Sequence, residues 1–309
     1  MSDIRLRAME RSDWPEVADL IYVSLNYWSV ANGRPTFFAG GPDATHVFCD
    51  VYETLDPGCC LVAESTKTGR LMGSCFYRER ELHLALGIMT VHPVYFGQGV
   101  GRALLGFICE AADRAGKPLR LVSSAMNLDS FSLYTRAGFV PRLTYQDMVL
   151  PVPAEGLRAE LPVSERVRPA AAGDVDAMAA IEIEVSGIIR TKDYRHFVEN
   201  PDGLWHVSVI EDSRGGLDGF LASIGHPLCN MIGPGVARTE EQAAALLLAE
   251  LNQYSGRMPL FLVPVHCREL VQLAYGWGAR NCELHVAQIR GDTQPFRGVS
   301  LPTFMPETG

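Results

Sequence analysis

The chain has 309 residues, of which 47% are hydrophobic and 20% charged, and its formal net charge at pH 7 is −9. This length and composition favour a globular protein of two domains, and the acidic balance argues against nucleic-acid binding. The eight cysteines form no CxxC pair, and no uncharged apolar stretch reaches 18 residues, so we expect no metal site, no membrane span and a cytoplasmic location.

The first half of the chain alternates predicted helices and strands. A helix is expected to begin near Ser12, a capping residue, with Pro15 in its first turn. Glycine and polar residues at 66–70 predict a hairpin turn between two strands. The elements expected in chain order are a helix at 12–25, strands at 58–64, 71–79 and 82–91, a helix at 101–115, a strand at 118–124, a helix at 129–137, and one or two strands within 139–150.

A proline-rich stretch follows, and its composition suits neither a helix nor a central strand. We interpret it as a linker over 151–168 that joins a first domain, 1–150, to a second, 169–309. The second domain repeats the element order of the first at an offset of about 140 residues. Its predicted elements are helices at 174–185, 240–254 and 268–277 and strands at 205–210, 219–224, 260–265 and 282–289. Each domain is therefore expected to be α/β with a mixed sheet.

The strongest local signal is a glycine loop between a strand and a helix. The predicted strand ends at Val91, a turn with Pro93 follows, and Gly97, Gly99 and Gly101 lead into an apolar-periodic helix. Glycines expose backbone N–H groups, and a helix start adds unpaired donors and partial positive charge, so this pattern is typical of a phosphate or pyrophosphate site. It fits neither the dinucleotide fingerprint nor the P-loop. A glycine-rich turn without a ligand is the alternative.

Two motifs resemble the GNAT superfamily of N-acyltransferases. The glycine loop is similar to its acyl-CoA loop, Gln/Arg-x-x-Gly-x-Gly/Ala, with Phe96 where Gln or Arg is usual. The stretch from Asn127 to Phe139 is similar to the family's Asn-x-x-Ala/Ser-x-x-Leu-Tyr-x-x-x-Gly-Phe. Together they cover about residues 70–140. The resemblance implies α+β architecture: two tandem GNAT-like domains, each with a mixed, mostly antiparallel central sheet flanked by helices.

The resemblance also implies acetyl-CoA, or another acyl-CoA, as co-substrate, with no metal. Tyr134 would protonate the leaving thiolate, as a tyrosine near the sulfur can do; a core tyrosine is the alternative. The backbone of Met89, Thr90 and Val91 would run beside the pantetheine and bind the thioester carbonyl. The other residues expected at the coenzyme are Phe96, Gly97, Gln98, Gly99, Val100, Gly101, Arg102, Asn127 and Ser130.

The general base is less obvious than the acid. Glu79, Glu81 and His83 lie on or next to central strands, and we take Glu81 and His83 as candidates beside the alternatives of solvated strand ends or a water relay. An aromatic-rich stretch after the first helix belongs to the acceptor pocket in this family or, alternatively, to ordinary core. Its members are Tyr22, Tyr27, Trp28, Phe37 and Phe38.

The second half lacks the corresponding loop. At an offset of 141, the three glycines fall on Arg238, Glu240 and Gln242, and Tyr134 is replaced by Ala274 at an offset of 140. Carboxylates at a helix start complement its dipole and repel a pyrophosphate. We therefore expect a degenerate second domain and an N-acetyltransferase that acts on a primary amine. The alternative is a non-catalytic acyl-CoA-binding or regulatory protein; the pattern indicates no particular oligomeric state.

Overall fold

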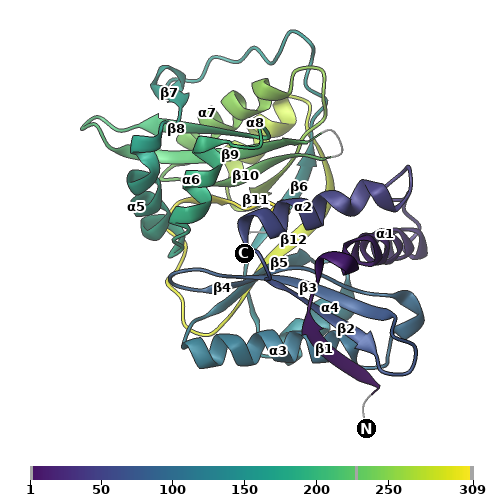
Figure 1. Ribbon diagram of the computed structural model, residues 1–309. Coiled ribbons are helices and arrows are strands. Elements are labelled where there is room, and N and C mark those ends of the chain that lie inside the picture. The colour runs from purple at the N-terminus through teal and green to yellow at the C-terminus, as the bar shows by residue number, and fades with distance from the viewer. Residues whose placement is uncertain (1–2, 227–228, 307–309) are drawn as a thin grey trace.

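The computed structural model describes residues 3–226 and 229–306 (Figure 1). Strands and helices alternate along the first half of the chain, and the second half has the same order of elements. The elements of the first half are β1 (Ile4–Ala8), α1 (Trp14–Ala31), α2 (His46–Leu55), β2 (Cys60–Ser65), β3 (Leu71–Glu79), β4 (Leu84–Val91), α3 (Val100–Ala115), β5 (Leu119–Ser124), α4 (Leu128–Arg136) and β6 (Val140–Val149).

The second half begins with a short edge strand. Its elements are β7 (Val167–Pro169), α5 (Val175–Ser186), α6 (Thr191–Glu199), β8 (Trp205–Glu211), β9 (Leu217–His226), β10 (Cys229–Ala237), α7 (Glu240–Leu251), β11 (Leu260–Pro264), α8 (Arg268–Gly276), β12 (Arg280–Arg290) and β13 (Val299–Leu301). A proline at the end of β7 is compatible with its place at the edge of the sheet.

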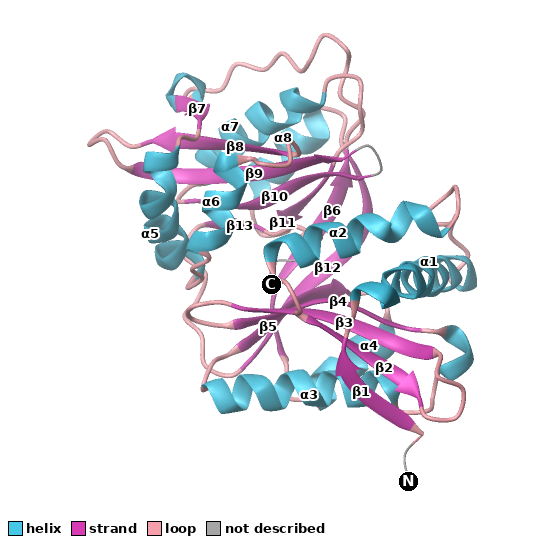
Figure 2. Ribbon diagram, in the orientation of Figure 1, coloured by secondary structure: helices cyan, strands magenta, loops and turns pink. Residues whose placement is uncertain are grey.

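The two halves share one sheet, which runs through the whole molecule (Figure 2). Its strand order is β1-β2-β3-β4-β5-β12-β6-β11-β10-β9-β8-β7, and β13 pairs with β10. Among the described strands, β4 pairs with β5 in parallel and β10 with β11 in parallel, whereas the other pairs are antiparallel. Strands β1 to β5 of the first half and β7 to β11 of the second thus follow each other in the same order, with β12 and β6 between the two sets. The sheet is mixed and mostly antiparallel, as the sequence predicts.

The halves exchange a strand at the centre of this sheet. Strand β12, from the second half, lies between β5 and β6 of the first half, and β6 lies between β12 and β11 of the second half. Tyr145 of β6 faces Pro264 on one side and His285 on the other. Backbone hydrogen bonds thus join residues from the two halves along the length of both strands. Sequence periodicity gives no sign of this exchange because it shows only that each segment is a strand.

Helices cover both faces of the sheet and make three main cores. Helix α3 packs on β2, β3 and β4 through Leu104, Leu105 and Ile108, whereas α1 and α2 pack on the opposite face. Helices α5 and α6 join α1 and α2 in a second core that contains both Phe48 and Phe197. Helix α7 is central to the third core, in the second half. No helix of the described chain has the length and apolar character needed to cross a membrane.

A buried ion network also joins the halves. Arg80, in the β3–β4 turn, contacts Asp56 at 2.7 Å and Asp193 of α6 at 2.8 Å. All three side chains are buried. Burial is the largest single influence on Asp56 and acts to raise its pKa, but Arg80, Arg78 and Lys192 together lower it further, so the pKa lies below its usual value. Lys192 of α6 adds an ion pair to Asp56 at 2.5 Å.

Several elements were not expected from the sequence. They are β1, α2, α6, β7, β10 and β13. Strand β10 contains Gly233-Pro234-Gly235, which argues against a regular strand, and the structure accommodates it by a register shift between Ile232 and Gly235. Helix α1 continues to Ala31, past the predicted end. In its last turns, Asn26 and Ser29 are buried and hydrogen-bond to the backbone of Phe38 and Pro35 in the α1–α2 loop.

Candidate functional site

The parallel strands β4 and β5 diverge and open the sheet. They pair at Leu84 with Leu119 and at Ala85 with Arg120, and no further pair follows among the described residues. Beyond these pairs, β4 continues for six residues with β3 as its partner on one edge. The backbone groups on its other edge therefore face the opening, where an extended ligand can hydrogen-bond to them.

The glycine loop lies at the end of β4 and opens α3. Gly97 and Gly99 have φ values of 75° and 85°, a left-handed region in which glycine is favoured. Residues 96–99 are exposed. Gly99 is the N-cap residue of α3 and supplies no side-chain cap, so the first N–H groups of the helix point to solvent without a side-chain acceptor. The structure thus brings an uncapped helix start to the mouth of the β4–β5 opening.

Gly73 of β3 explains how closely α3 approaches the sheet. A Cβ atom at this position would lie 2.7 Å from the Thr90 carbonyl oxygen and 3.0 Å from Val100 Cγ1. Only glycine therefore leaves room for the first turn of α3 against β4. Gly73 is not among the site residues predicted above, although an isolated glycine within a predicted strand is a signal of close backbone approach.

Tyr134 lies on α4, the helix that follows β5. Its side chain is 6% exposed and packs against Phe139, with ring centroids 5.8 Å apart. Asn127 is the N-cap of α4 and accepts a hydrogen bond from the Ser130 backbone N–H at 3.1 Å. This cap explains the Asn-x-x-Ser spacing physically, because Asn127 fixes the start of the helix that carries Tyr134.

The two candidates for the base lie at the closed end of the opening. Glu81 is exposed in the β3–β4 turn. His83 is buried beside the point where β4 and β5 pair, and burial together with Arg190, Arg120 and other cations holds its pKa well below the ordinary value. An imidazole with such a depressed pKa is a weak base. The structure brings neither residue to the end of β4 that carries the glycine loop.

The aromatic stretch lies beside the glycine loop. Tyr27 of α1 makes an edge-to-face contact with Phe96, with centroids 5.8 Å apart. Trp28 stacks on Phe37 of the α1–α2 loop at 6.1 Å. Tyr27, Phe37 and Phe96 are each about half exposed. An aromatic surface thus borders the loop on the side of α1.

The corresponding opening in the second half is filled. Strands β10 and β11 pair at Met231 and Ile232 and then separate. Strand β13 pairs with β10 from Gly235 to Ala237, while β9 holds the other edge of β10 over the same residues. Strand β13 therefore lies on the edge that β11 leaves, and the chain itself satisfies backbone groups that are free for a ligand in the first half.

The start of α7 is also closed, unlike the start of α3. Thr239 caps this helix and forms a capping box with Gln242. The Glu240 carboxylate accepts hydrogen bonds from the backbone N–H groups of Glu269 and Leu270 at 2.7 and 3.0 Å, at the start of α8. An anion at the start of α7 would meet this negative charge and would find the Gln242 N–H already occupied by the Thr239 cap.

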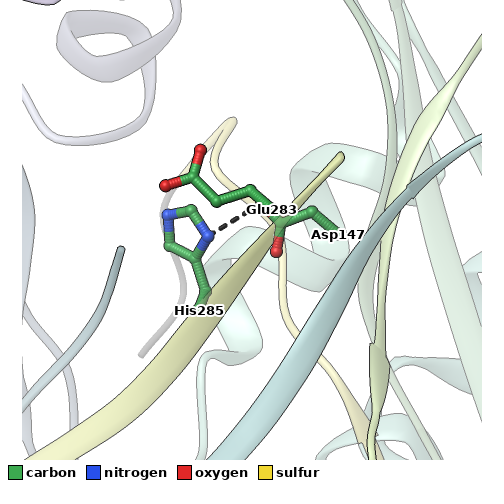
Figure 3. Close-up of side chains that lie close together, drawn as sticks. All are labelled: Asp147, Glu283 and His285. Atoms are coloured by element: carbon green, nitrogen blue, oxygen red, sulfur yellow. Dashed lines mark ion pairs between the residues drawn. The ribbon is translucent and has the colours of Figure 1, made fainter. Parts of the chain in front are cut away.

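A polar cluster lies on the exchanged strands, one strand away from β5 (Figure 3). His285 Nδ1 lies 2.7 Å from Asp147 Oδ2, and Glu283 binds Arg34 at 3.2 Å and also accepts a hydrogen bond from Ser124. No local pattern in the sequence points to these residues. Asp147 and Glu283 are more than 130 positions apart, and only the strand exchange places them opposite each other.

Comparison with known proteins agrees with this geometry. Residues 56–141 match the family model described as an acetyltransferase (GNAT) domain. The matched segment runs from the loop before β2 through the glycine loop to the start of β6, and so includes the β4–β5 opening, the start of α3 and Tyr134. The chain therefore contains a GNAT acetyltransferase domain.

Solved structures extend the similarity to the whole chain at the level of the fold. A putative acetyltransferase from Pyrococcus horikoshii is 16% identical with a TM-score of 0.71, covering 97% of this chain and 95% of that one. A GCN5-related N-acetyltransferase from Sphaerobacter thermophilus is 17% identical with a TM-score of 0.65, covering 96% and 98%. A tandem GNAT protein of the clavulanic acid biosynthesis pathway is 16% identical with a TM-score of 0.58, covering 94% and 100%. The fold is that of tandem GNAT proteins.

The chain also matches a curated relative over a short region. UPF0157 protein YqkA of Bacillus subtilis is 38% identical over 73 residues, which make up 24% of this chain and 21% of the relative. The match thus spans about a fifth of that relative's length.

Proposed function

We propose that this protein transfers an acetyl group from acetyl-CoA to a primary amine. The observation that carries the proposal is the arrangement of three features around one opening: the free edge of β4, the uncapped start of α3 and the helix that carries Tyr134. The pyrophosphate binds the N–H groups of residues 97–102 through the helix dipole. The pantetheine extends along Met89, Thr90 and Val91.

In this proposal, the chemistry needs an oriented thioester and an acid. The amine nitrogen attacks the thioester carbonyl carbon, whose oxygen is held by a backbone N–H of β4. The C–S bond breaks, and Tyr134 donates its phenolic proton to the leaving sulfur. Burial of Tyr134 supports this role because a partly desolvated hydroxyl holds a fixed direction.

In this proposal the first domain, 1–150, binds the coenzyme, and the second domain, 169–309, has a supporting role. The linker, 151–168, joins them. The shared core of α1, α2, α5 and α6 supports this assignment, because the second half packs over the face of the first half opposite α3. In this arrangement the second half shapes the acceptor side of the site. The aromatic surface at Tyr27, Phe37 and Phe96 forms another part of that side.

The test combines coenzyme binding with turnover. Isothermal titration calorimetry measures acetyl-CoA affinity, and release of the CoA thiol is followed with acetyl-CoA and a panel of primary amines: tyramine, glucosamine, spermidine, lysine and an α-amino peptide. Gly101→Glu places a carboxylate at the start of α3 and is expected to abolish binding. Gly106→Glu is the matched control, since a Cβ there meets no atom within 4 Å and the position is one turn further along the same helix.

Two results would contradict the proposal. Unchanged affinity in a folded Gly101→Glu variant would remove the glycine loop from the coenzyme site. Tight acetyl-CoA binding without thiol release for any amine would favour the alternative, a non-catalytic acyl-CoA-binding or regulatory protein. Phe96, which replaces the usual Gln or Arg of the loop, is the observation that favours this second function.

A further inference from the structure

We infer that His285, held by Asp147, is the general base that takes a proton from the acceptor amine. The inference rests on the proposed acyl transfer and identifies the group that this transfer lacks. Its basis is the polar cluster on β6 and β12, to which the second half contributes Glu283 and His285. Figure 3 shows the His285 ring directed from β12 toward Asp147, with the Glu283 carboxylate beside it.

The sheet register places His285 level with the thioester-binding part of β4. His285 is the partner of Ser124 in the pairing of β12 with β5. Ser124 and Met89 each lie five residues beyond the paired residues Leu119 and Leu84, where β5 and β4 begin to diverge. His285 therefore lies one strand from the opening, near the level of Met89 rather than at the closed end where His83 lies.

The Asp147 carboxylate suits a histidine that gains and loses a proton. Asp147 is 2% exposed, and its Oδ2 lies 2.7 Å from His285 Nδ1. The contact is close but lacks hydrogen-bond geometry, since Nδ1 has no hydrogen-bond partner among the described residues. A small rotation of the ring would bring an Nδ1 proton onto the carboxylate and leave a lone pair on Nε2. The other oxygen, Oδ1, is buried with no hydrogen-bond partner among the described residues. In the proposed role, Asp147 holds the His285 ring in one orientation.

Glu283 is less suited to the role of base. One of its oxygens accepts a hydrogen bond from the Ser124 hydroxyl, and the other binds the Arg34 guanidinium at 3.2 Å. Both oxygens therefore already have partners, and neither is free to take a proton from an amine. The same contacts disfavour a divalent cation in this cluster, because both oxygens of Glu283 are occupied and a guanidinium already lies next to them.

Glu283 instead connects the cluster to the proposed coenzyme site. The Ser124 hydroxyl, which donates to Glu283, accepts hydrogen bonds from the backbone N–H groups of Met126 and Asn127 at 3.1 and 3.2 Å. Asn127 in turn caps α4, the helix that carries Tyr134.

The charged groups that face His285 are Asp147 from β6 and Glu283 from its own strand, with Arg34 of the α1–α2 loop beyond Glu283.

The protons balance in this scheme. His285 Nε2 takes one proton from the ammonium form of the acceptor, and the neutral amine attacks the thioester carbon. The C–N bond forms and the C–S bond breaks. Tyr134 gives its proton to the sulfur and is reprotonated by the proton that the acylated nitrogen releases. His285 returns its proton to solvent, and Asp147 remains ionised throughout as a positioning residue.

The experiment compares His285→Gln, His285→Ala and Asp147→Asn with the matched control His266→Gln, an exposed histidine between β11 and α8. The assay is CoA thiol release from acetyl-CoA with the best primary amine of the panel, from pH 5.5 to 9. We expect His285→Gln to lower kcat/KM about 10²–10⁴-fold, the usual contribution of a positioned base. We also expect loss of the rate increase between low and neutral pH, with unchanged acetyl-CoA affinity. Asp147→Asn should lower kcat in the same pH range, and His266→Gln should change nothing.

Two further measurements separate a base from a structural residue. Added imidazole should restore part of the rate of His285→Ala. Hydroxylamine, which is already neutral at pH 7, should react at similar rates with the wild type and with His285→Gln.

Full activity of His285→Gln would overturn the assignment while leaving acyl transfer intact. Equal losses of rate for hydroxylamine and the primary amine, without rescue by imidazole, would do the same. Inhibition by EDTA with recovery on added Zn²⁺ would replace it with a metal site. A wild type that binds acetyl-CoA but acetylates no amine would refute the proposed function, and the assignment with it.

Discussion

Leu301 lies opposite Gly235 in the antiparallel pairing of β13 with β10, on the edge of β10 that faces the divergence from β11. The second half thus closes with its own backbone the opening that the first half leaves free between β4 and β5. Thr239 and Gln242 cap α7, whereas Gly99 leaves α3 without a side-chain cap. Sequence comparison of the two halves predicts the loss of the loop, but the filling of the opening is visible only in the structure.

The first prediction is one acetyl-CoA site per chain. Titration calorimetry on the full-length protein should give a stoichiometry of one. Gly101→Glu should remove all binding, because Thr239 and Gln242 cap the start of α7 and Glu240 places negative charge beside it. A residual site in Gly101→Glu, or a stoichiometry of two, would show that the second half retains a coenzyme site.

The second prediction concerns Tyr134. If its hydroxyl protonates the leaving sulfur, Tyr134→Phe should lower kcat about 10²–10⁴-fold, the range for a positioned acid. Acetyl-CoA affinity should change little, since the buried ring and its contact with Phe139 are retained. Tyr254→Phe, a buried tyrosine of the second half, is the matched control. Equal activity in wild type and Tyr134→Phe would leave Tyr134 with a packing role.

The sequence predicts those parts of the proposed site that depend on a local pattern of residues. The glycine loop and the Asn127-to-Phe139 motif each lie within a short segment, so backbone conformation and spacing identify them. His285 and Asp147 belong together only because two strands are exchanged between distant segments, and such pairing is a property of the tertiary structure. Strand β10 was missed for another reason: its Gly-Pro-Gly run has the composition of a turn, and neighbouring strands override that preference.

The third prediction is that Arg80 contributes strongly to stability. Arg80→Met leaves the buried carboxylates of Asp56 and Asp193 without their main counter-ion. Breaking a buried pair in this way costs about 3–5 kcal/mol. Arg5→Met, which removes an exposed partner of Glu64, should cost about 0–1 kcal/mol. Urea denaturation of the two variants measures the difference, and similar midpoints would contradict the importance of this network.

The fourth prediction is that the free energy of unfolding changes with pH near neutrality because of His206. Its Nδ1 lies 2.9 Å from the fully buried Glu250, and this contact raises the pKa of His206 despite partial burial. A raised folded-state pKa contributes stability that is fully present below the unfolded value of about 6.5 and is lost as pH rises through the folded value.

The urea midpoint of the wild type should therefore fall between pH 6 and pH 8.5. His206→Gln should show a flatter profile, so that the two proteins differ most at low pH. His266→Gln, at an exposed site, should follow the wild type. A His206→Gln variant with the same slope as the wild type would assign the pH dependence to other groups.

The last prediction is that neither half folds alone, although each has the sequence pattern of a domain. A fragment of residues 1–155 lacks β12, which lies between β5 and β6 and pairs with both. A fragment of residues 156–309 lacks β6, which pairs with both β11 and β12. Each fragment would expose unpaired strand edges at the centre of its sheet, and such edges promote aggregation. Cooperative urea unfolding should be absent from each fragment in isolation. Coexpression should yield a 1:1 complex with acetyl-CoA affinity close to that of the intact chain, because the missing strand comes from the partner fragment. A soluble, monomeric fragment 1–155 that unfolds cooperatively would show that the exchanged strands are not required for folding.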